Sequence, residues 1–203
     1  MIQALDRFHQ ILNFWFGKPD EPDYGKSRKV WFTKNPDFDQ EMRSRSVTFG
    51  QSRFLDIYQQ AAAGELDNWQ TSPYSCLALI ILLDQFPRNM FRGQPQAFAT
   101  DSKALSTAQY AVNQGFDKEL LPVQRWFIYL PFEHSENLEH QRYCVELFST
   151  LKDDPDSAST INYAYRHLEV IERFGRFPHR NKILGRVNTP EEEEFIKLPG
   201  SSF

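Results

Sequence analysis

The sequence has few cysteines and no long apolar run. Its two cysteines, Cys76 and Cys144, stand in apolar surroundings and outside any Cys-x-x-Cys pair, which predicts buried, reduced thiols rather than a disulfide framework. The longest apolar run, residues 76–83, is eight residues long, whereas a membrane span needs about 20. The N-terminus lacks a basic region followed by an apolar stretch, so we expect no signal peptide. Together these absences predict a cytoplasmic protein that is not embedded in a membrane.

Several patterns that carry chemistry are also absent. The chain contains neither Gly-x-Gly-x-x-Gly nor Gly-x-x-x-x-Gly-Lys-Ser/Thr, which argues against a standard nucleotide site, and no Gly-x-Ser-x-Gly elbow. Glu136 and His140 are spaced to share a helical face, but no His-Glu-x-x-His motif accompanies them, so we expect no metal and no other cofactor. A net charge of −4 and a pI near 5.8 argue against a general nucleic-acid or anionic-membrane binder.

Alternation of apolar and polar residues over strand length is nearly absent, and helical spacing dominates. Residues 77–83 are apolar on all sides and predict a central buried helix, with a buried strand as the alternative. Pro87 is expected to end that helix. We therefore predict an all-α fold of about eight helices in antiparallel hairpins, forming one domain over residues 1–203, with a short helix and tail in residues 186–203. The expected helical stretches are 2–16, 36–64, 73–86, 101–114, 122–129, 135–148, one from Ser157 or Ser159 to Phe174, and one beginning at the capping-box pattern Thr189-Pro-Glu-Glu192. Gly50 either divides or weakens the stretch over residues 36–64.

Residues 173–186 concentrate positive charge. They contain four Arg, one Lys and one His, and no carboxylate. Because the whole chain carries −4 and this segment carries five positive charges, the rest of the chain carries −9. Guanidinium groups make planar, bidentate contacts with carboxylates and phosphates. The segment therefore predicts an anion-binding corner, and the anion is either a ligand or a set of internal carboxylates such as Asp84, Asp101, Glu133 and Glu136.

A second segment, residues 84–93, again joins Phe-Pro to Arg and Asn. We predict that these two Phe-Pro segments lie side by side and form one ligand site. The predicted ligand-binding residues are Arg88, Arg92, Arg176, His179, Arg180 and Arg186.

Residues 133–136, with the sequence Glu-His-Ser-Glu, are the best candidates for acid–base chemistry. His134 titrates near neutral pH and Glu136 is placed to orient it. The alternative is local capping, in which Pro131 precedes a helix start and Ser135 is the N-cap. His179 is a further catalytic candidate because it lies between Pro178 and Arg180, whereas His167 lies on an apolar stripe and is expected in the core.

Long and unusual motifs along nearly the whole chain carry a family resemblance. They are Phe14-Trp-Phe-Gly17, Trp31-Phe32, residues 61–69, residues 77–93, Ala97-Phe-Ala-Thr-Asp101, residues 130–138, residues 174–186 and Thr189-Pro-Glu-Glu192. In these motifs the chain resembles the uncharacterised bacterial domain-of-unknown-function 924 family. The resemblance implies an all-helical fold similar to tetratricopeptide-like stacks, in a cytoplasmic protein without an assigned activity. The chain departs from the family at Val187-Asn188, where Glu-Ser is usual, so no role is expected for a carboxylate there.

Three hypotheses of function follow from these residues. The first is binding of a small anionic ligand or an acidic peptide terminus in an Arg- and His-rich cleft. The second is a protein–protein adaptor that uses a helical groove. The third is an enzyme with His134 or His179 as the acid–base residue. The sequence does not predict an oligomeric state.

Overall fold

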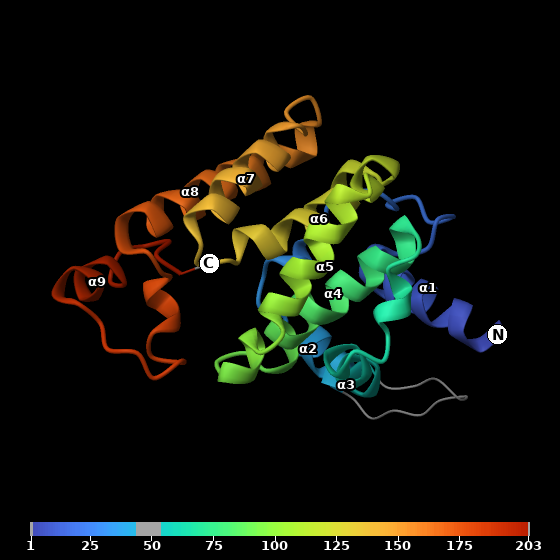
Figure 1. Ribbon diagram of the computed structural model, residues 1–203, viewed down its shortest axis with the longest axis horizontal. Coiled ribbons are helices and arrows are strands. Elements are labelled where there is room, and N and C mark those ends of the chain that lie inside the picture. Colours follow the sequence, from blue (N-terminus) through green and yellow to red (C-terminus); the bar gives the residue numbers. More distant parts are fainter. Residues whose placement is uncertain (1, 44–53, 203) are drawn as a thin grey trace.

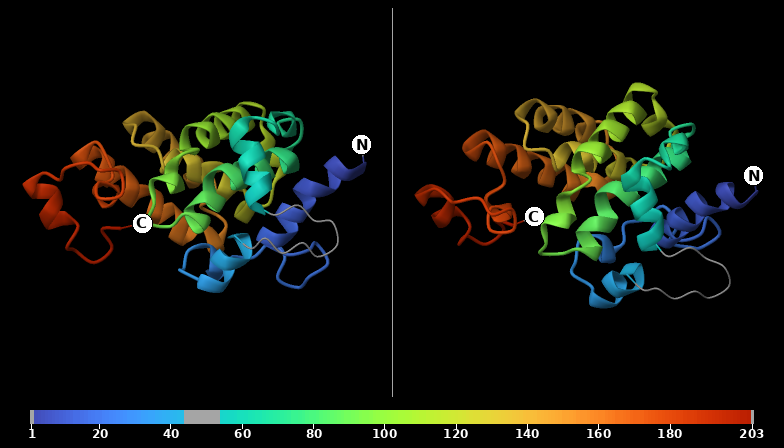
Figure 2. Two further views of the ribbon diagram at one scale, coloured as in Figure 1. Left: turned by 90° about the horizontal axis from the view of Figure 1, so that it is seen from below. Right: turned by 60° about the horizontal axis from the view of Figure 1, so that its bottom comes forward.

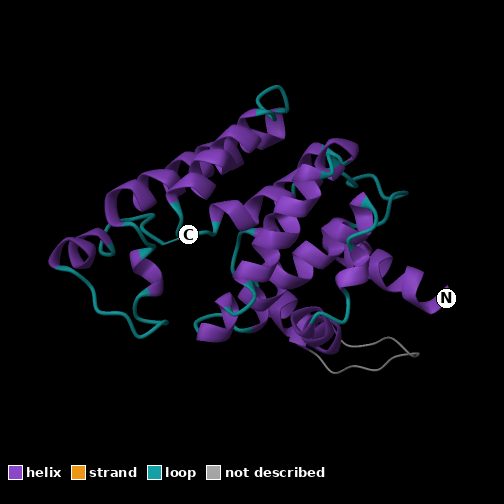
Figure 3. Ribbon diagram, viewed as in Figure 1, coloured by secondary structure: helices purple, strands orange, loops and turns teal. Residues whose placement is uncertain are grey.

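The computed structural model describes residues 2–43 and 54–202, and over these residues the chain is helical (Figure 1). Within those two ranges there are nine α-helices and no strand (Figure 3), which confirms the all-α prediction and the expected number of helices. The helices are α1 (Ile2–Phe16), α2 (Pro36–Arg43), α3 (Phe54–Ala63), α4 (Pro73–Met90), α5 (Asp101–Asn113), α6 (Pro122–Glu133), α7 (Leu138–Ser149), α8 (Ala158–Phe174) and α9 (Pro190–Phe195). The middle of the helical stretch expected over residues 36–64, including Phe49 and Gly50, lies outside the described residues.

Helix α4 is the centre of the fold. It packs against α1, α2, α3, α5 and α6, and it is buried from Ser75 to Pro87. The Ser72 side chain caps its first turn by accepting a hydrogen bond from the Ser75 N–H at 3.3 Å. An apolar sequence on all sides of a helix is stable only where neighbours cover every face. The prediction of a central buried helix, rather than a strand, is confirmed.

The prediction that Pro87 ends this helix is wrong, because α4 continues to Met90. Proline has no N–H and leaves the carbonyl four residues earlier, that of Leu83, without its helical partner. The Thr100 hydroxyl donates to this carbonyl at 2.6 Å and replaces the missing bond. The extra turn places Arg88 and Asn89 on the same continuous helix as Asp84.

The helices from α4 to α8 pack in sequence, each against the next, and α7 and α8 lie side by side along one edge of the molecule (Figure 2). Beyond α8 the chain folds back as a smaller cluster, in which Phe177 is fully buried beside Val170 and Ile171. This cluster lies at the opposite end from the N-terminus (Figure 1). The similarity to tetratricopeptide stacks and the single domain stay predictions.

The basic segment begins at the end of α8. Gly175 has a φ of 68°, and its N–H bonds to the Ile171 carbonyl at 2.9 Å, so the helix ends in a left-handed turn that favours glycine. A 3₁₀ turn, Pro178–Arg180, follows and points back toward α4 and α6. The chain then reaches α9, where Thr189 and Glu192 form the predicted capping box.

Candidate functional site

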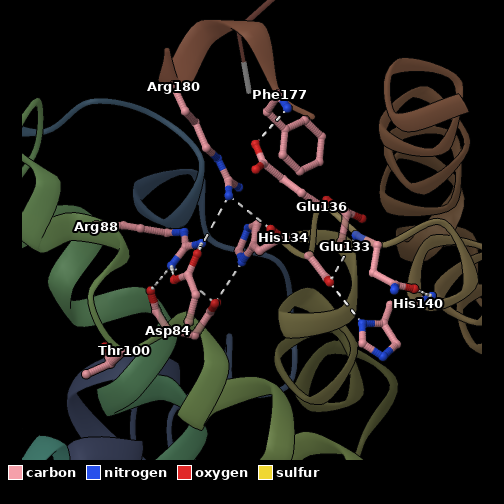
Figure 4. A network of polar contacts seen from close by, with 12 residues as sticks. Asp84, Arg88, Thr100, Glu133, His134, Glu136, His140, Phe177 and Arg180 are labelled. Atoms are coloured by element: carbon pink, nitrogen blue, oxygen red, sulfur yellow. Dashed lines mark hydrogen bonds and ion pairs between the residues drawn. The ribbon is translucent and has the colours of Figure 1, made fainter. Parts of the chain in front are cut away.

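Glu133 and His134 lie at the end of a helix, not at the start of one as the capping interpretation predicted. Pro131 is inside α6, Glu133 is its last residue and His134 is its C-cap. The next N-cap is Asn137 instead of Ser135, because the Asn137 side-chain oxygen accepts both the Glu139 and His140 N–H groups, at 2.9 and 3.1 Å. The junction between α6 and α7 therefore presents His134 toward Asp84 of α4 (Figure 4), whereas the Glu133 carboxyl lies beside His167 of α8.

The two Phe-Pro segments meet at Asp101, the first residue of α5. Arg88 binds its carboxylate in a bidentate manner, at 2.7 Å from Nη1 and 3.0 Å from Nη2. The Nη1 of Arg180 lies 3.7 Å from the same carboxylate and donates to the His134 carbonyl at 3.0 Å. Figure 4 shows Arg180 reaching from the C-terminal segment toward Arg88 and His134. The predicted proximity of the two segments is confirmed.

Asp84 organises the polar centre of this region and is 1% exposed. One carboxylate oxygen lies 2.7 Å from the His134 Nδ1 and 3.2 Å from the Arg88 Nη1, and the other accepts from Gln85 at 2.6 Å. Burial by itself raises the pKa of Asp84, but Arg88 and His134 outweigh burial and lower the pKa to about 2. Asp84 is therefore a carboxylate at neutral pH and accepts a hydrogen bond from the His134 Nδ1–H.

Most of the predicted arginines pair with carboxylates of the protein. Arg92 binds Asp39, Arg176 binds Glu192 and Arg186 binds Glu136, each through two nitrogens of the guanidinium group. Glu136 also accepts the Phe177 N–H at 2.7 Å. Burial raises the pKa of Glu136, but the bonds from Arg186 and Phe177 lower it below its usual value. These pairs fix the C-terminal segment against the α6–α7 junction.

Arg180 differs from the other predicted arginines. Within residues 2–43 and 54–202 it makes no bidentate contact with a carboxylate, and its Nε, like that of Arg186, has no hydrogen-bond partner. The residue is 6% exposed and is sandwiched between the rings of Phe177 and Phe98, at 4.4 and 4.9 Å from the ring centroids. Burial, followed by repulsion from Arg88, lowers the pKa of Arg180 to about 10. Arg180 thus carries a buried charge that the protein only partly compensates.

A cavity of about 750 Å³ opens beside these residues. The residues with ionisable groups on its wall include Arg88, Glu133, His134, His167, His179 and Arg180. The apolar part of the wall includes Trp31, Phe32, Ala97, Phe98, Leu130 and Ile183. Of the predicted site residues, Arg88, Arg92, His134, His179 and Arg180 meet at this cavity, whereas Arg176, Arg186 and Glu136 lie in the neighbouring ion pairs.

Glu133 is a cavity residue that the sequence suggested as a partner for arginine and as part of the Glu-His-Ser-Glu stretch, but not as an acid–base residue by itself. It is 4% exposed, one oxygen lies 3.3 Å from the His167 Nδ1, and the other has no hydrogen-bond partner in the described part of the chain. Burial and the nearby Asp84 raise the pKa of Glu133 to about 8. His167, which was expected in the core, is buried on the same wall, and burial holds its pKa well below the usual value. The end of an apolar helical run at Glu133 was the one sequence signal for a buried carboxyl.

His179 lies on the cavity wall, whereas the two cysteines do not. Burial and the Arg180 charge lower the pKa of His179 to about 4, so its imidazole is neutral at pH 7. Both cysteines are buried, and burial raises the pKa of Cys76 to about 12. Across the described ranges, no cluster of three or more His, Cys, Asp or Glu side chains has an arrangement suited to a metal ion. None of the described helices has the length and apolar character needed to cross a membrane.

The fold and the cavity define a class of protein: an all-helical protein with a cavity whose wall combines ionisable and aromatic side chains. Residues 11–200 match the model of the family described as bacterial protein of unknown function (DUF924), and the chain belongs to this family. A solved structure, that of the protein of unknown function ATU0120 from Agrobacterium tumefaciens, is 38% identical and has a TM-score of 0.80. The match covers 97% of this chain and 99% of that one. Among curated proteins, no sequence matches the chain.

Proposed function

We propose that the protein binds a small monoanionic ligand in the cavity, with Arg180 as the contact to its anionic group. The observation that carries this proposal is the buried Arg180 guanidinium, which retains an unused donor and has no carboxylate in a bidentate contact. A buried charge without a full partner costs several kcal/mol, by an order-of-magnitude estimate. An anionic ligand would compensate that charge when it binds.

The charges around Arg180 favour a ligand with a single negative charge. The carboxylates of Asp84 and Asp101 offset most of the positive charge of Arg88 and Arg180, and the charge that remains at Arg180 is small for a polyphosphate. Glu133 is uncharged at neutral pH and adds no repulsion. The site therefore suits a carboxylate better than a nucleotide.

The shape and the apolar wall favour a carboxylate attached to an aromatic or aliphatic body. Phe98 and Leu130 line the cavity together with Trp31, and its volume of about 750 Å³ is in the range of small-molecule sites, roughly 300–1,000 Å³. A cavity with charged side chains on a partly apolar wall favours a small molecule over a folded protein partner, so we place the adaptor hypothesis second. An acidic peptide terminus has the same carboxylate chemistry and is a separate arm of the test.

The test is a thermal-shift titration of the full chain with benzoate, hexanoate, a short peptide with a free C-terminal carboxylate, inorganic phosphate and ATP. The variants are Arg180→Met and the control Arg173→Met, whose arginine is half exposed and pairs with Glu191 on the surface. At 100 times Kd a ligand stabilises by about 2.7 kcal/mol, which raises Tm by roughly 5–10 °C in a protein of this size. We expect this rise with benzoate or hexanoate in the wild type and in Arg173→Met, and its loss in Arg180→Met.

Two outcomes would contradict the proposal. An equal rise of Tm in Arg180→Met would mean that the carboxylate binds elsewhere. A rise with ATP but not with benzoate or hexanoate would mean that the site accepts polyanions. Stabilisation by the peptide alone would mean that the ligand is a peptide C-terminus and not a small molecule.

A further inference from the structure

We propose that the cavity is an acid–base catalytic site, in which His134, oriented by Asp84, removes a proton from the bound carboxylate ligand and Glu133 supplies a proton to a second atom of it. This inference rests on the ligand-binding proposal above. It names His134 and Glu133 as catalytic residues, since both line the cavity, and Asp84 as the positioning residue behind His134.

The hydrogen bond to Asp84 determines which nitrogen of His134 is available. A carboxylate only accepts hydrogen bonds, so the 2.7 Å contact from Nδ1 requires the proton on Nδ1. The basic lone pair is then on Nε2, which makes no hydrogen bond to any residue that the structure describes. A histidine with one nitrogen held by a buried carboxylate and the other at a cavity is arranged as a general base.

Asp84 is held firmly enough to orient the ring. Its side chain is buried and receives bonds from Gln85 and Arg88 as well as from His134. Arg88 in turn donates to the Asp84 carbonyl at 2.8 Å and is fixed by its bidentate contact with Asp101. Preorganisation of this kind keeps a base aligned without reorganisation during the reaction.

Glu133 and Asp84 are two carboxyl groups with opposite properties in the same region. Asp84 is surrounded by donors and charged, whereas Glu133 has one oxygen without a hydrogen-bond partner in the described chain. Burial and Asp84 raise the pKa of Glu133 to about 8, so it holds a proton at neutral pH. Paired groups whose environments separate their pKa values divide into an acid and a base.

The groups that surround His134 come from every neighbouring element. They are Asp84 and Arg88 of α4, Asp101 of α5, Glu133 of α6, His167 of α8, and His179 and Arg180 of the 3₁₀ turn. Burial and the Arg88 charge lower the pKa of His134, and they outweigh the opposite effect of Asp84 and Asp101. The imidazole is therefore uncharged at pH 7 and available as a base.

The chemistry is a proton shift within the ligand. The His134 Nε2 accepts a proton from a C–H next to a carbonyl group, and the electron pair of that bond stays on the ligand. The Glu133 carboxyl gives its proton to the carbonyl oxygen where the negative charge collects, so that the ligand becomes its enol isomer. The imidazolium proton then passes to the Glu133 carboxylate through water, which restores both residues. The substrate class is a small carboxylate with an apolar body and an acidic C–H beside a carbonyl.

Phenylpyruvate has all of these properties and is the probe. In D₂O, ¹H NMR follows the loss of its C3–H signal, with binding checked by thermal shift. We expect the wild type to accelerate exchange about 100-fold or more over buffer, the usual contribution of a positioned acid or base, and His134→Gln and Glu133→Gln to remove most of the acceleration. Phenylpyruvate that binds without faster exchange overturns the inference while leaving the binding proposal intact.

A second measurement does not depend on turnover. Diethyl pyrocarbonate transfers its carbethoxy group to an unprotonated imidazole nitrogen and releases carbon dioxide and ethanol, and peptide mass spectrometry gives the rate at each histidine. We expect His134 to react at least as fast as the exposed His9, and benzoate to slow the reaction at His134 but not at His9. Asp84→Asn should slow His134 on the order of tenfold or more, because the amide no longer specifies the tautomer.

The outcomes separate the two proposals. An unreactive His134 in a protein that still shows Arg180-dependent binding of benzoate overturns the catalytic inference alone. A reactive His134 that benzoate does not protect, together with no thermal shift, overturns the binding proposal and the catalytic inference with it. The exchange of phenylpyruvate and the reaction with diethyl pyrocarbonate, both measured on the wild type, test the catalytic inference even if Asp84→Asn does not fold.

Discussion

Replacing Glu133 by Gln should stabilise the protein increasingly as the pH rises. Glu133 is buried beside Asp84, and its pKa is raised from the ordinary 4.5 to about 8. In the unfolded chain the carboxyl ionises near its ordinary pKa, whereas in the folded protein it keeps its proton up to about pH 8. Stability is therefore complete below pH 4.5 and is lost as the pH rises from there to about 8. Glutamine is uncharged at every pH and has no such loss.

The magnitude follows from the difference between the two pKa values. Each pH unit corresponds to about 1.4 kcal/mol, so the wild type should lose about 3 kcal/mol by pH 7 and about 5 kcal/mol above pH 8. Glu133→Gln should then match the wild type within about 1 kcal/mol at pH 5 and exceed it by several kcal/mol at pH 9. Glutamine is close to the protonated carboxyl in shape, so the packing of the cavity wall is preserved.

Urea denaturation at pH 5, 7 and 9 measures this difference, with unchanged m-values as the sign that the compared states are the same. The matched control is Glu139→Gln, which removes an exposed carboxylate that pairs with Arg142 on α7. The control should change the free energy of unfolding by less than about 1 kcal/mol at each pH. Parallel pH profiles for the wild type and Glu133→Gln would refute the description of Glu133 as a buried, protonated group.

Two further predictions concern the contacts that hold the site. Thr100→Val should lower the free energy of unfolding by about 1–3 kcal/mol, because it leaves the Leu83 carbonyl without a donor. Pro87→Ala restores an N–H in α4, so the double variant should recover part of the lost free energy of unfolding in urea denaturation. If the effects of the two substitutions simply add, Thr100 does not replace the hydrogen bond that Pro87 removes. Asp84→Asn should flatten the loss of stability in acid. The pKa of Asp84 is lowered to about 2, so its stabilisation is present above pH 3.8 and is lost as the pH falls toward 2. An unchanged acid transition by circular dichroism would contradict this.

Local signals in the sequence were sufficient for most helix positions. Ser72-Pro73, Pro122 and the Thr189 capping box mark starts that the structure places at the same residues. These signals work because they satisfy or remove N–H groups within one turn of the chain. Pro87 misled the prediction because its compensating partner, Thr100, lies 13 residues beyond it and on another element. A contact of this kind has no local pattern.

Asp84, Asp101 and Glu136 were expected as partners of the arginines and do pair with them, but which carboxylate meets which arginine could not be predicted, for the same reason. Arg88 pairs with a carboxylate 13 residues away, Arg92 with one 53 residues away and Arg186 with one 50 residues away. The sequence showed that many arginines would need anions, but only the fold determines which carboxylates reach them. Once the fold has paired the others, Arg180 stands out as the arginine with an unused donor at a cavity.

Only one residue of the acid–base pair, His134, could be predicted individually from the sequence. His134 was a candidate because of its residue type, whereas Glu133 was included only as part of the Glu-His-Ser-Glu stretch, since a glutamate looks the same in the sequence whether it is charged or protonated. The burial of Glu133 at the end of α6 and the nearby Asp84 on α4 together raise its pKa, so that Glu133 keeps its proton at neutral pH. Asp84 also orients His134, so one buried carboxylate prepares both residues. Removing Asp84 should therefore weaken the base and lower the pKa of Glu133 together. A variant that changed only one of the two would mean that Asp84 does not link them.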